Sequence, residues 1–235
     1  MKIIPVIDLK DGLVVHAHQG QRDNYQPINS QLCQSANIHQ VINAFLKLYE
    51  FDTFYIADLN AITGQGHHLE LLEQVLLDFS DIIFWIDRGY LSSQDNYRLP
   101  KNHLPILGSE SYQDENISEM EAYGNNFILS LDFSGSVGLG AKMLFTNPRL
   151  WPEHIIIMTL EKVGSQNGPA FQKLNDLAWH HPDKRFIAAG GVRDTADLIN
   201  LKKAGVHHAL IASALHSGTI NKVDITNIQA KKYPD

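Results

Sequence analysis

Short apolar runs alternate with longer amphipathic runs along most of the chain. Runs of four or five apolar residues are too short for helices and suit strands buried on both faces of a parallel sheet. Between them, apolar residues recur at helical spacing, as at Val41, Ile42 and Phe45. The predicted strands are 3–7, 53–57, 82–86, 104–107, 127–131, 155–158, 186–189 and 209–212. The predicted helices are 38–50, 69–77, one from about residue 92, 117–123, 171–179 and 196–204.

Eight strand–helix units in strict alternation predict a parallel, closed (β/α)8 barrel. The chain has 235 residues, 44% of them hydrophobic, which suits a single barrel domain over residues 1–235. Three segments fall outside the alternation. Residues 13–18 alternate as a β excursion over the barrel mouth, 19–37 form a long polar loop of the functional or mobile kind, and 134–138 form a loose loop.

Charge and cysteine content exclude several classes of protein. The net charge of −7, with no basic run, argues against a nucleic-acid partner. Cys33 is the only cysteine, so no disulfide framework exists and a reducing compartment is expected. No apolar stretch has the length of a membrane span, and the chain opens on a strand rather than a signal peptide. We therefore expect a cytoplasmic protein with no membrane partner.

Two neighbouring strand ends near the C-terminus have the pattern of a phosphate site. Gly190 and Gly191 follow one predicted strand, and Asp194 or Thr195 then offers an N-cap for the next helix. Paired glycines expose backbone N–H groups that accept an anion. The next strand delivers Ala212 and Ser213 to the start of another short helix. The pair resembles the phosphate clamp after strands 7 and 8 of a (β/α)8 barrel, although a Gly-Gly alone also suits an ordinary turn.

The sequence contains an internal repeat. The segment around Asp8 resembles the segment around Asp132, half a chain later. The strand ends at Gly89 and at Gly108-Ser109 correspond to the two strand ends of the phosphate clamp. The repeat predicts two similar half-barrels with a second clamp at Gly89, Gly108 and Ser109, and hence a ligand with a phosphate at each end.

Three predicted strands end on an aspartate, namely Asp8, Asp58 and Asp132. Acidic residues at the carboxyl ends of barrel strands are commonly catalytic. Two carboxyl groups facing one another can divide the roles of acid and base. Each aspartate can instead close an Asx turn or cap a helix, and for Asp58 the two interpretations are equally open.

The opening MKIIPVIDLKDGLVVHAHQG is similar to that of the ProFAR isomerase family of histidine biosynthesis. Segments 126–135 and 186–216 carry the rest of the resemblance, which runs over almost the whole chain. It implies a ribulose-phosphate-binding (β/α)8 barrel that performs an Amadori-type aldose–ketose rearrangement of a doubly phosphorylated aminosugar. The resemblance further implies a small phosphorylated substrate and no cofactor or metal. Asp8 and Asp132 stand at the family's catalytic positions, and we assign them as base and acid.

The predicted loop after 155–158 departs from the family. The family carries a Thr and an Asp in this loop. Thr159 is an approximate match to the Thr and a third candidate catalytic residue, whereas Val163 stands where the Asp belongs. Glu161 would serve as the missing carboxylate if the correspondence is shifted by two residues.

Other departures concern substrate contacts. His16 replaces the arginine that the family has after its first excursion; His16 and His18 point to the same side of the segment, which leaves open that one of them enters the mouth. Asp87 would repel a phosphate at the second clamp, whereas Arg88 would attract one. Arg22 and Tyr25, in the long first loop, are candidates for an ionic and a stacking contact.

Other constellations carry less chemistry. The histidine doublets at 67–68, 180–181 and 207–208 lack further ligands at metal spacing, so exposed histidines are expected and no metal site. Trp151 either stacks on a substrate ring or anchors its loop between Pro148 and Pro152.

Three function classes remain open from the sequence. The first is an isomerase of the ProFAR kind, which the absence of the family Asp at Val163 disfavours. The second is a related barrel enzyme acting on a different phosphorylated sugar or heterocycle outside histidine biosynthesis. The third is a non-catalytic sugar-phosphate binder, which the presence of both Asp8 and Asp132 disfavours. The sister cyclase of the same pathway has a lysine after its first strand. This chain has His-Ala-His at residues 16–18 in that region, which disfavours the cyclase.

Overall fold

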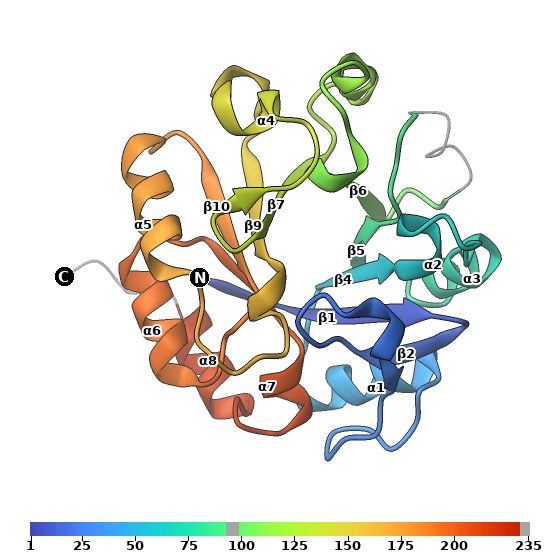
Figure 1. Ribbon diagram of the computed structural model, residues 1–235. Coiled ribbons are helices and arrows are strands. Elements are labelled where there is room, and N and C mark those ends of the chain that lie inside the picture. The colour runs from blue at the N-terminus through green and yellow to red at the C-terminus, as the bar shows by residue number, and fades with distance from the viewer. Residues whose placement is uncertain (93–98, 231–235) are drawn as a thin grey trace.

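The computed structural model describes residues 1–92 and 99–230, and its centre is a closed barrel of eight parallel strands (Figure 1). The pairing order runs through β1, β4, β5, β6, β7, β9, β10 and β11, and β11 pairs back with β1. The barrel strands are β1 (Lys2–Lys10), β4 (Thr53–Asp58), β5 (Ile83–Asp87), β6 (His103–Gly108), β7 (Ile128–Ser134), β9 (His154–Thr159), β10 (Arg185–Ala189) and β11 (His208–Ile211). The predicted (β/α)8 barrel is confirmed.

Helices surround the barrel, with α5, α6 and α8 along one side and α2 and α3 along another (Figure 1). The α-helices are α1 (Ile38–Leu48), α2 (Leu59–Ile62), α3 (Leu69–Asp78), α4 (Met143–Thr146), α5 (Phe171–His180), α6 (Thr195–Lys203), α7 (Ser213–His216) and α8 (Lys222–Gln229). The 3-10 helices are η1 (Arg22–Asn24), η3 (Ser109–Ser111), η4 (Ile117–Tyr123), η5 (Pro148–Leu150) and η6 (Leu160–Lys162). Asp194, one of the two predicted N-caps, caps α6 by accepting a hydrogen bond from the N–H of Asp197.

The strict alternation of strand and helix is wrong in the middle of the chain. The segment 117–123 is a 3-10 helix, and the helix expected from about residue 92 lies mainly outside the described residues. After β7 the chain forms a hairpin with β8 (Val137–Gly138), where a loose loop was expected. The four-residue α4 then ends at Thr146, because Pro148 disfavours helical geometry in Asn147, the residue before it.

The excursion predicted at 13–18 is confirmed as β2 (Leu13–His16), which pairs antiparallel with β1. The long loop after it contains η1 and the two-residue strand β3 (Gln26–Pro27), which pairs with β2. Further along the mouth, the N–H of Gln19 donates to the carbonyl of Val163 at 2.7 Å. The loop therefore lies against the loop after β9, above the barrel mouth.

Apolar residues fill two layers, one inside the barrel and one between the barrel and its helices. Ile4, Ile106, Ile156 and Ile187 are fully buried in the inner layer. At the amino ends of the strands, His208 lies edge-on to Trp85, and the inner core closes this end. The barrel is therefore open to a ligand at the carboxyl ends of its strands.

Three histidines of the doublets, His68, His181 and His208, are not exposed, contrary to expectation. His68 is partly buried and donates from Nδ1 to Asp58 at 2.8 Å, while its Nε2 accepts the N–H of Gly12. The Nδ1 atom of His208 is buried, and burial lowers the pKa of His208 to about 4. The imidazoles of His68 and His208 therefore face protein, whereas those of their neighbours His67 and His207 are exposed.

Within residues 1–92 and 99–230, no helix combines the length and apolar character that crossing a bilayer requires.

Candidate active site

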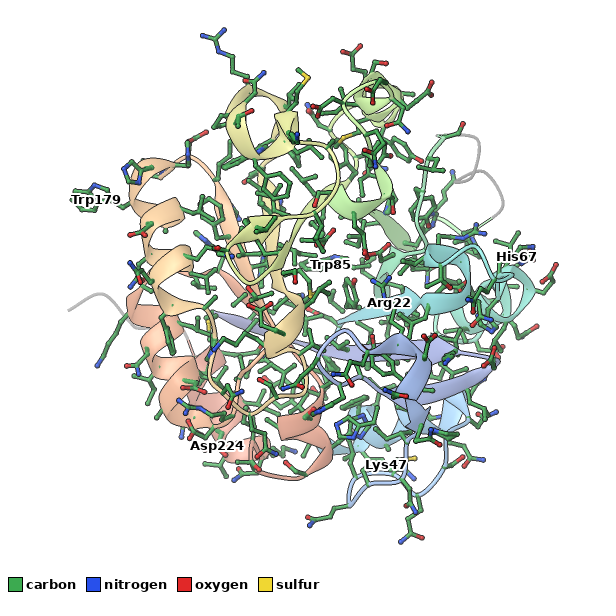
Figure 2. All side chains as sticks on the ribbon, in the orientation of Figure 1. Arg22, Lys47, His67, Trp85, Trp179 and Asp224 are labelled. Atoms are coloured by element: carbon green, nitrogen blue, oxygen red, sulfur yellow. The ribbon has the colours of Figure 1, made fainter. Side chains whose placement is uncertain are left out.

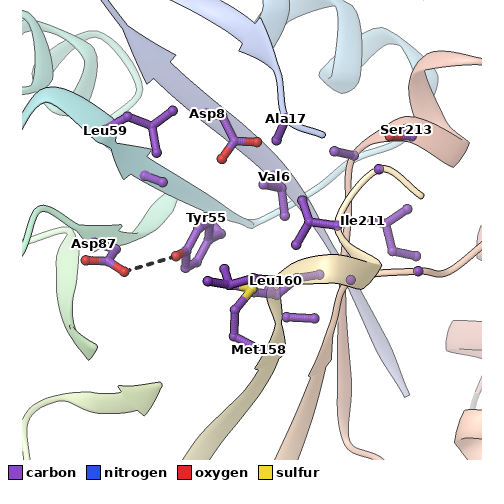
Figure 3. Close-up of a pocket in the computed structure, with 18 of the residues that line it drawn as sticks. Val6, Asp8, Ala17, Tyr55, Leu59, Asp87, Met158, Leu160, Ile211 and Ser213 are labelled. Carbon is purple, nitrogen blue, oxygen red and sulfur yellow. Dashed lines mark hydrogen bonds between the residues drawn. The ribbon is translucent and has the colours of Figure 1, made fainter. Parts of the chain in front are cut away.

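A cavity of about 980 Å³, part of it open to solvent, lies at the carboxyl ends of the barrel strands. Figure 3 shows Asp87 and Ser213 at opposite ends of this cavity, with Asp8 and Tyr55 between them. Its polar lining residues are Asp8, Arg22, Tyr25, Tyr55, Asp87, Glu110, Asp132, Gln166 and Ser213. A concave pocket with convergent polar groups is the usual form of a small-molecule site.

Strand periodicity explains why the carboxylates enter the cavity. On β1 the side chains of Ile4 and Val6 face the barrel interior, so the next inward position is Asp8. On β7 the same alternation carries Ile128 inward and then Asp132. Because β1 and β7 are the first and fifth of eight barrel strands, the two carboxyl groups enter from opposite sides.

Asp8 is partly exposed within the cavity, and no hydrogen bond joins its carboxyl group to another of the described residues. Burial raises the pKa of Asp8 to about 7, while the positive charge of Arg22 lowers it in part. A carboxyl group with free lone pairs and a pKa near neutrality is suited to take a proton from a ligand.

Asp132 is buried and held by several hydrogen bonds. Its carboxylate accepts from the hydroxyl of Ser130 at 2.7 Å, the hydroxyl of Ser109 at 3.3 Å and the N–H of Glu110 at 3.2 Å. Burial raises the pKa of Asp132 to about 7, and the charges of Glu110 and Asp87 add to the increase. Asp8 and Asp132 thus have matched pKa values but different freedom to move.

Asp87 is a third cavity carboxylate. Tyr55 donates to it at 3.3 Å, drawn as a dashed line in Figure 3, and the N–H of Gly89 donates at 3.2 Å. Burial raises the pKa of Asp87 to about 6, against the lowering effect of the Gly89 hydrogen bond. The sequence placed Asp87 near a phosphate clamp but did not predict a site carboxylate there.

Arg22 reaches the cavity from η1 in the long loop and pairs with Glu110. Figure 2 shows Arg22 inside the ring of elements, whereas Lys47 and Trp179 lie at the periphery. Burial opposes the charge of Arg22, but Glu110 holds its pKa above the usual value. Glu110 was missed by sequence reasoning, although its position directly after the Gly108-Ser109 strand end was a usable signal.

The first predicted phosphate clamp lines the cavity in full, since Gly190, Gly191, Ala212 and Ser213 all face it. Gly191 has a φ of +85°, and a Cβ there would lie 2.3 Å from the carbonyl oxygen of Gly168. Only glycine permits that approach. The backbone at the carboxyl end of β10 therefore packs directly against the loop that contains Gly168. The clamp is therefore a feature of tertiary packing as well as of local sequence.

His16 lies at the edge of this clamp. Its Nε2 is 3.2 Å from the hydroxyl oxygen of Ser213, and its side chain is exposed. The alternation of β2 directs Ala17, between His16 and His18, into the cavity instead. His16 is thus placed to contact a ligand at the clamp without filling the mouth.

The three residues expected to form the second clamp, Gly89, Gly108 and Ser109, do not line the cavity. Ser109 is fully buried, where its hydroxyl bonds to Asp132. A Cβ on Gly108 would lie 3.2 Å from Asp132 and 3.7 Å from Asp87, so the two carboxylates flank this residue.

Asp58, Thr159 and Arg88 also lie outside the cavity lining. Asp58 caps α2 by accepting the N–H of Ala61, and it binds His68; the helix-cap interpretation is therefore the one that its contacts match. Thr159 faces away from the barrel interior with a buried hydroxyl, and its neighbour Met158 lines the cavity. The guanidinium of Arg88 lies 5.7 Å from the ring centre of Tyr90.

Val163, which the sequence resemblance matches to a family Asp, lines the cavity. Glu161 does not, because its carboxylate accepts the N–H of Gly135 at 2.9 Å. Tyr25 is buried in the cavity wall, and burial together with the charge of Asp8 raises the pKa of Tyr25 to about 12. Trp151 is instead buried behind its own loop, donating to the carbonyl of Leu144 at 2.6 Å.

Across the part of the chain that the structure describes, no group of three or more His, Cys, Asp or Glu side chains is arranged to hold a metal ion. The other cavity carboxylates, Asp87, Glu110 and Asp132, are paired with hydroxyls, backbone N–H groups and Arg22 instead.

Fold and cavity define a (β/α)8 barrel with a glycine-lined clamp and paired carboxylates at its mouth. A family model described as "Histidine biosynthesis protein" matches residues 2–221. The chain belongs to this family.

Relatives of the chain span nearly its whole length. An uncharacterized protein of Methanocaldococcus jannaschii is 32% identical over 232 residues, covering 97% of this chain and 98% of the relative. A protein of Listeria innocua named as the imidazole-4-carboxamide isomerase (ProFAR isomerase) is 24% identical, covering 99% and 100%. An isomerase of the same name from Thermococcus onnurineus is 21% identical, covering 97% and 99%. The substrate in that printed name carries two phosphoribosyl groups.

Proposed function

We propose that this protein is an isomerase that performs an Amadori-type aldose–ketose rearrangement on a phosphorylated aminosugar. The observation that carries the proposal is the pair Asp8 and Asp132, which enter one cavity from opposite strands with pKa values of about 7. Groups with pKa values near the working pH are the most effective acids and bases. The family and the names of the isomerase relatives support the same class of reaction.

The chemistry assigns one step to each carboxyl group. Protonated Asp132 gives its proton to the ring oxygen, and the nitrogen lone pair opens the sugar ring to a protonated imine at C1. Asp8 as a carboxylate removes the proton from C2, and the electron pair moves to form an enolamine. Return of a proton to C1 and loss of one from the C2 hydroxyl complete the ketose, and no external oxidant or reductant is needed.

The clamp supplies binding in this proposal. Backbone N–H groups of Gly190, Gly191 and Ala212, with the Ser213 hydroxyl, hold the phosphate of the substrate. His16 adds a contact at the edge of the clamp. Fixing the phosphate orients C1 and C2 between the two carboxyl groups, which is how binding remote from the reacting atoms contributes to rate.

A second candidate keeps this site but changes the substrate to another phosphorylated sugar or heterocycle outside histidine biosynthesis. Val163 favours it, since an apolar wall replaces the family's carboxylate in the loop after β9. A non-catalytic sugar-phosphate binder is the weakest of the three alternatives, because binding alone gives no reason to bury two carboxyl groups with raised pKa values.

Proton exchange tests the proposal whichever sugar phosphate is the natural substrate. Purified protein is incubated in D2O with a panel of aldose phosphates and their glycosylamines, ProFAR included, and NMR follows deuterium at C2 of the aldose and at C1 of the ketose. We expect enzyme-dependent exchange for at least one glycosylamine phosphate, abolished in Asp8→Asn. Binding of panel members without exchange would support the non-catalytic alternative and contradict the proposal.

A further inference from the structure

We infer that the substrate carries a single phosphate and, at its opposite end, an amino group, because only one of the two repeated strand-end pairs is open to an anion. This inference rests on the proposed function and specifies its substrate. It separates this chain from the relatives whose printed substrate has two phosphoribosyl groups. The strand ends of β5 and β6 differ from those of β10 and β11 in hydrogen bonding and in charge.

The backbone N–H groups at the β5 and β6 ends are already bonded to the protein's own carboxylates. The N–H of Gly89 donates to Asp87 at 3.2 Å. The N–H of Glu110 donates to Asp132, also at 3.2 Å. These are the donors that a second phosphate would need at helix-start and strand-end positions. Aspartate carboxylates therefore occupy the place of an anionic ligand.

The hydroxyl at this end is also engaged. Ser109 donates to the carboxylate of Asp132 at 3.3 Å and accepts the N–H of the same residue at 2.9 Å. Its side chain is fully buried, outside the cavity lining. A ligand would have to break both contacts to reach it, leaving a buried carboxylate short of a donor.

The β10 and β11 ends differ in this respect. Among the described residues, no side chain accepts a hydrogen bond from the N–H of Gly191 or Ser213. The hydroxyl of Ser213 has one side-chain neighbour, His16, which is exposed at the rim and is itself a donor to anions. This end therefore presents free donors to the cavity, and the phosphate belongs here.

Charge separates the two ends further. Asp87, Glu110 and Asp132 line one end, and Arg22, which is paired with Glu110, is the only Lys or Arg among the described lining residues. A phosphate there would meet like charges in a buried setting, which is strongly unfavourable. An ammonium group would instead be stabilised by the carboxylates of Asp87 and Glu110.

Three flexible ligands of equal chain length test the inference on the intact protein. 5-Aminopentyl phosphate, 5-hydroxypentyl phosphate and pentane-1,5-diyl bisphosphate are titrated at pH 7 with protein NMR as the readout. We expect the amino compound to bind about tenfold more tightly than the hydroxy compound, since a charge-assisted contact replaces a neutral one. The bisphosphate should bind no more tightly than the hydroxy compound. A bisphosphate that binds tenfold more tightly, or an amino compound that gains nothing, overturns the inference.

Variants at the β5 and β6 strand ends test the role of Asp87 in ligand preference. Asp87→Asn should reduce the preference for the amino compound several-fold, and Asp87→Gly should also free the Gly89 N–H and improve bisphosphate binding. Asp81→Asn is the matched control, because it removes the same charge from an exposed position. Equal preferences in Asp87→Asn and Asp81→Asn would contradict the assignment of Asp87.

The same titrations separate this inference from the proposed function. Ser213→Ala should weaken the binding of all three ligands, because a phosphate of each binds at the β10 and β11 strand ends. If none of the three binds, or if Ser213→Ala has no effect, the proposed phosphate site fails and this inference fails with it. If Ser213→Ala weakens binding but the bisphosphate is preferred, the proposed site stands and only the single-phosphate inference is lost.

Discussion

The buried carboxylate of Asp58 accepts a hydrogen bond of 2.8 Å from Nδ1 of His68 and one of 2.9 Å from the N–H of the same residue. Nε2 of His68 in turn accepts the N–H of Gly12, at the turn between β1 and β2. Because Nε2 is an acceptor, Nδ1 carries the proton. Asp58 thus joins the start of α3 to the hairpin beside Asp8, without contacting the cavity.

We expect Asp58→Asn to lower the free energy of unfolding by about 2–4 kcal/mol, because buried donors lose a charged acceptor. Turnover per folded molecule should change little. Asp78→Asn is the control, since Asp78 also contacts a histidine, at 3.0 Å, but on the surface, and should cost less than about 1 kcal/mol. Chemical denaturation measures both. Equal costs for the two variants would contradict a structural role for Asp58.

Proton transfer depends on Asp8 and Asp132 in the proposed mechanism. We expect Asp8→Asn and Asp132→Asn each to lower turnover by roughly a hundredfold or more, the usual contribution of a positioned acid or base. Circular dichroism should show both variants folded, with Asp132→Asn the less stable because it rearranges three hydrogen bonds. Turnover by Asp8→Asn at the wild-type rate would show that the base is another group.

The pKa of Asp87 predicts a pH-dependent stability. Its folded value of about 6 lies above the ordinary value of 3.8, so the folded protein binds more protons than the unfolded chain between those pH values. Stability from this group is therefore present at low pH and is lost as the pH rises through about 6. Asp87→Asn removes the titration, and it should gain about 2 kcal/mol relative to wild type between pH 4 and pH 8.

Urea denaturation at several pH values measures this gain for Asp87→Asn. Asp81→Asn, at an exposed position, should follow the wild-type profile throughout. A difference between Asp87→Asn and wild type that is constant with pH would show that Asp87 titrates normally.

Inorganic phosphate probes the clamp by itself. Ser213→Ala should weaken its binding about tenfold to a hundredfold, the effect of one hydrogen bond to a charged group. Ser217→Ala, four residues later in an exposed position, should leave binding unchanged. Isothermal titration calorimetry provides the affinities. Identical affinities for wild type and Ser213→Ala would place the anion elsewhere.

We expect the chain to be a poor ProFAR isomerase and to fail to complement a histidine auxotroph that lacks this enzyme. Val163 has no side-chain hydrogen-bonding group where the family has a carboxylate, and Glu161 is bonded to Gly135 instead. Val163→Asp should raise the rate with ProFAR while leaving it below that of an authentic isomerase. Robust activity in the unmodified protein would contradict this prediction.

Hydrophobic periodicity determined the barrel strands and most surrounding helices. Buried parallel strands read as short apolar runs whatever their neighbours, so 3–7 and 186–189 were predictable from local pattern alone. The glycines at 190–191 were predictable for a similar reason, since they mark a strand end with exposed backbone donors. The prediction of an α-helix was wrong where the chain is polar and interrupted, as at 117–123. Packing rather than intrinsic propensity selected the 3-10 form there.

Only the tertiary structure decided which strand ends face the cavity and with what charge. The repeat in the sequence predicts two equivalent clamps, but equivalence in sequence does not specify which donors are free. The Asp87 carboxylate accepts the N–H of Gly89 two residues later, a local contact, but the Asp132 carboxylate accepts the N–H of Glu110 from a separate strand end, which local pattern cannot reveal. Similarly, burial sets the pKa values of Asp8 and Asp132, and burial is a property of the closed barrel rather than of either residue.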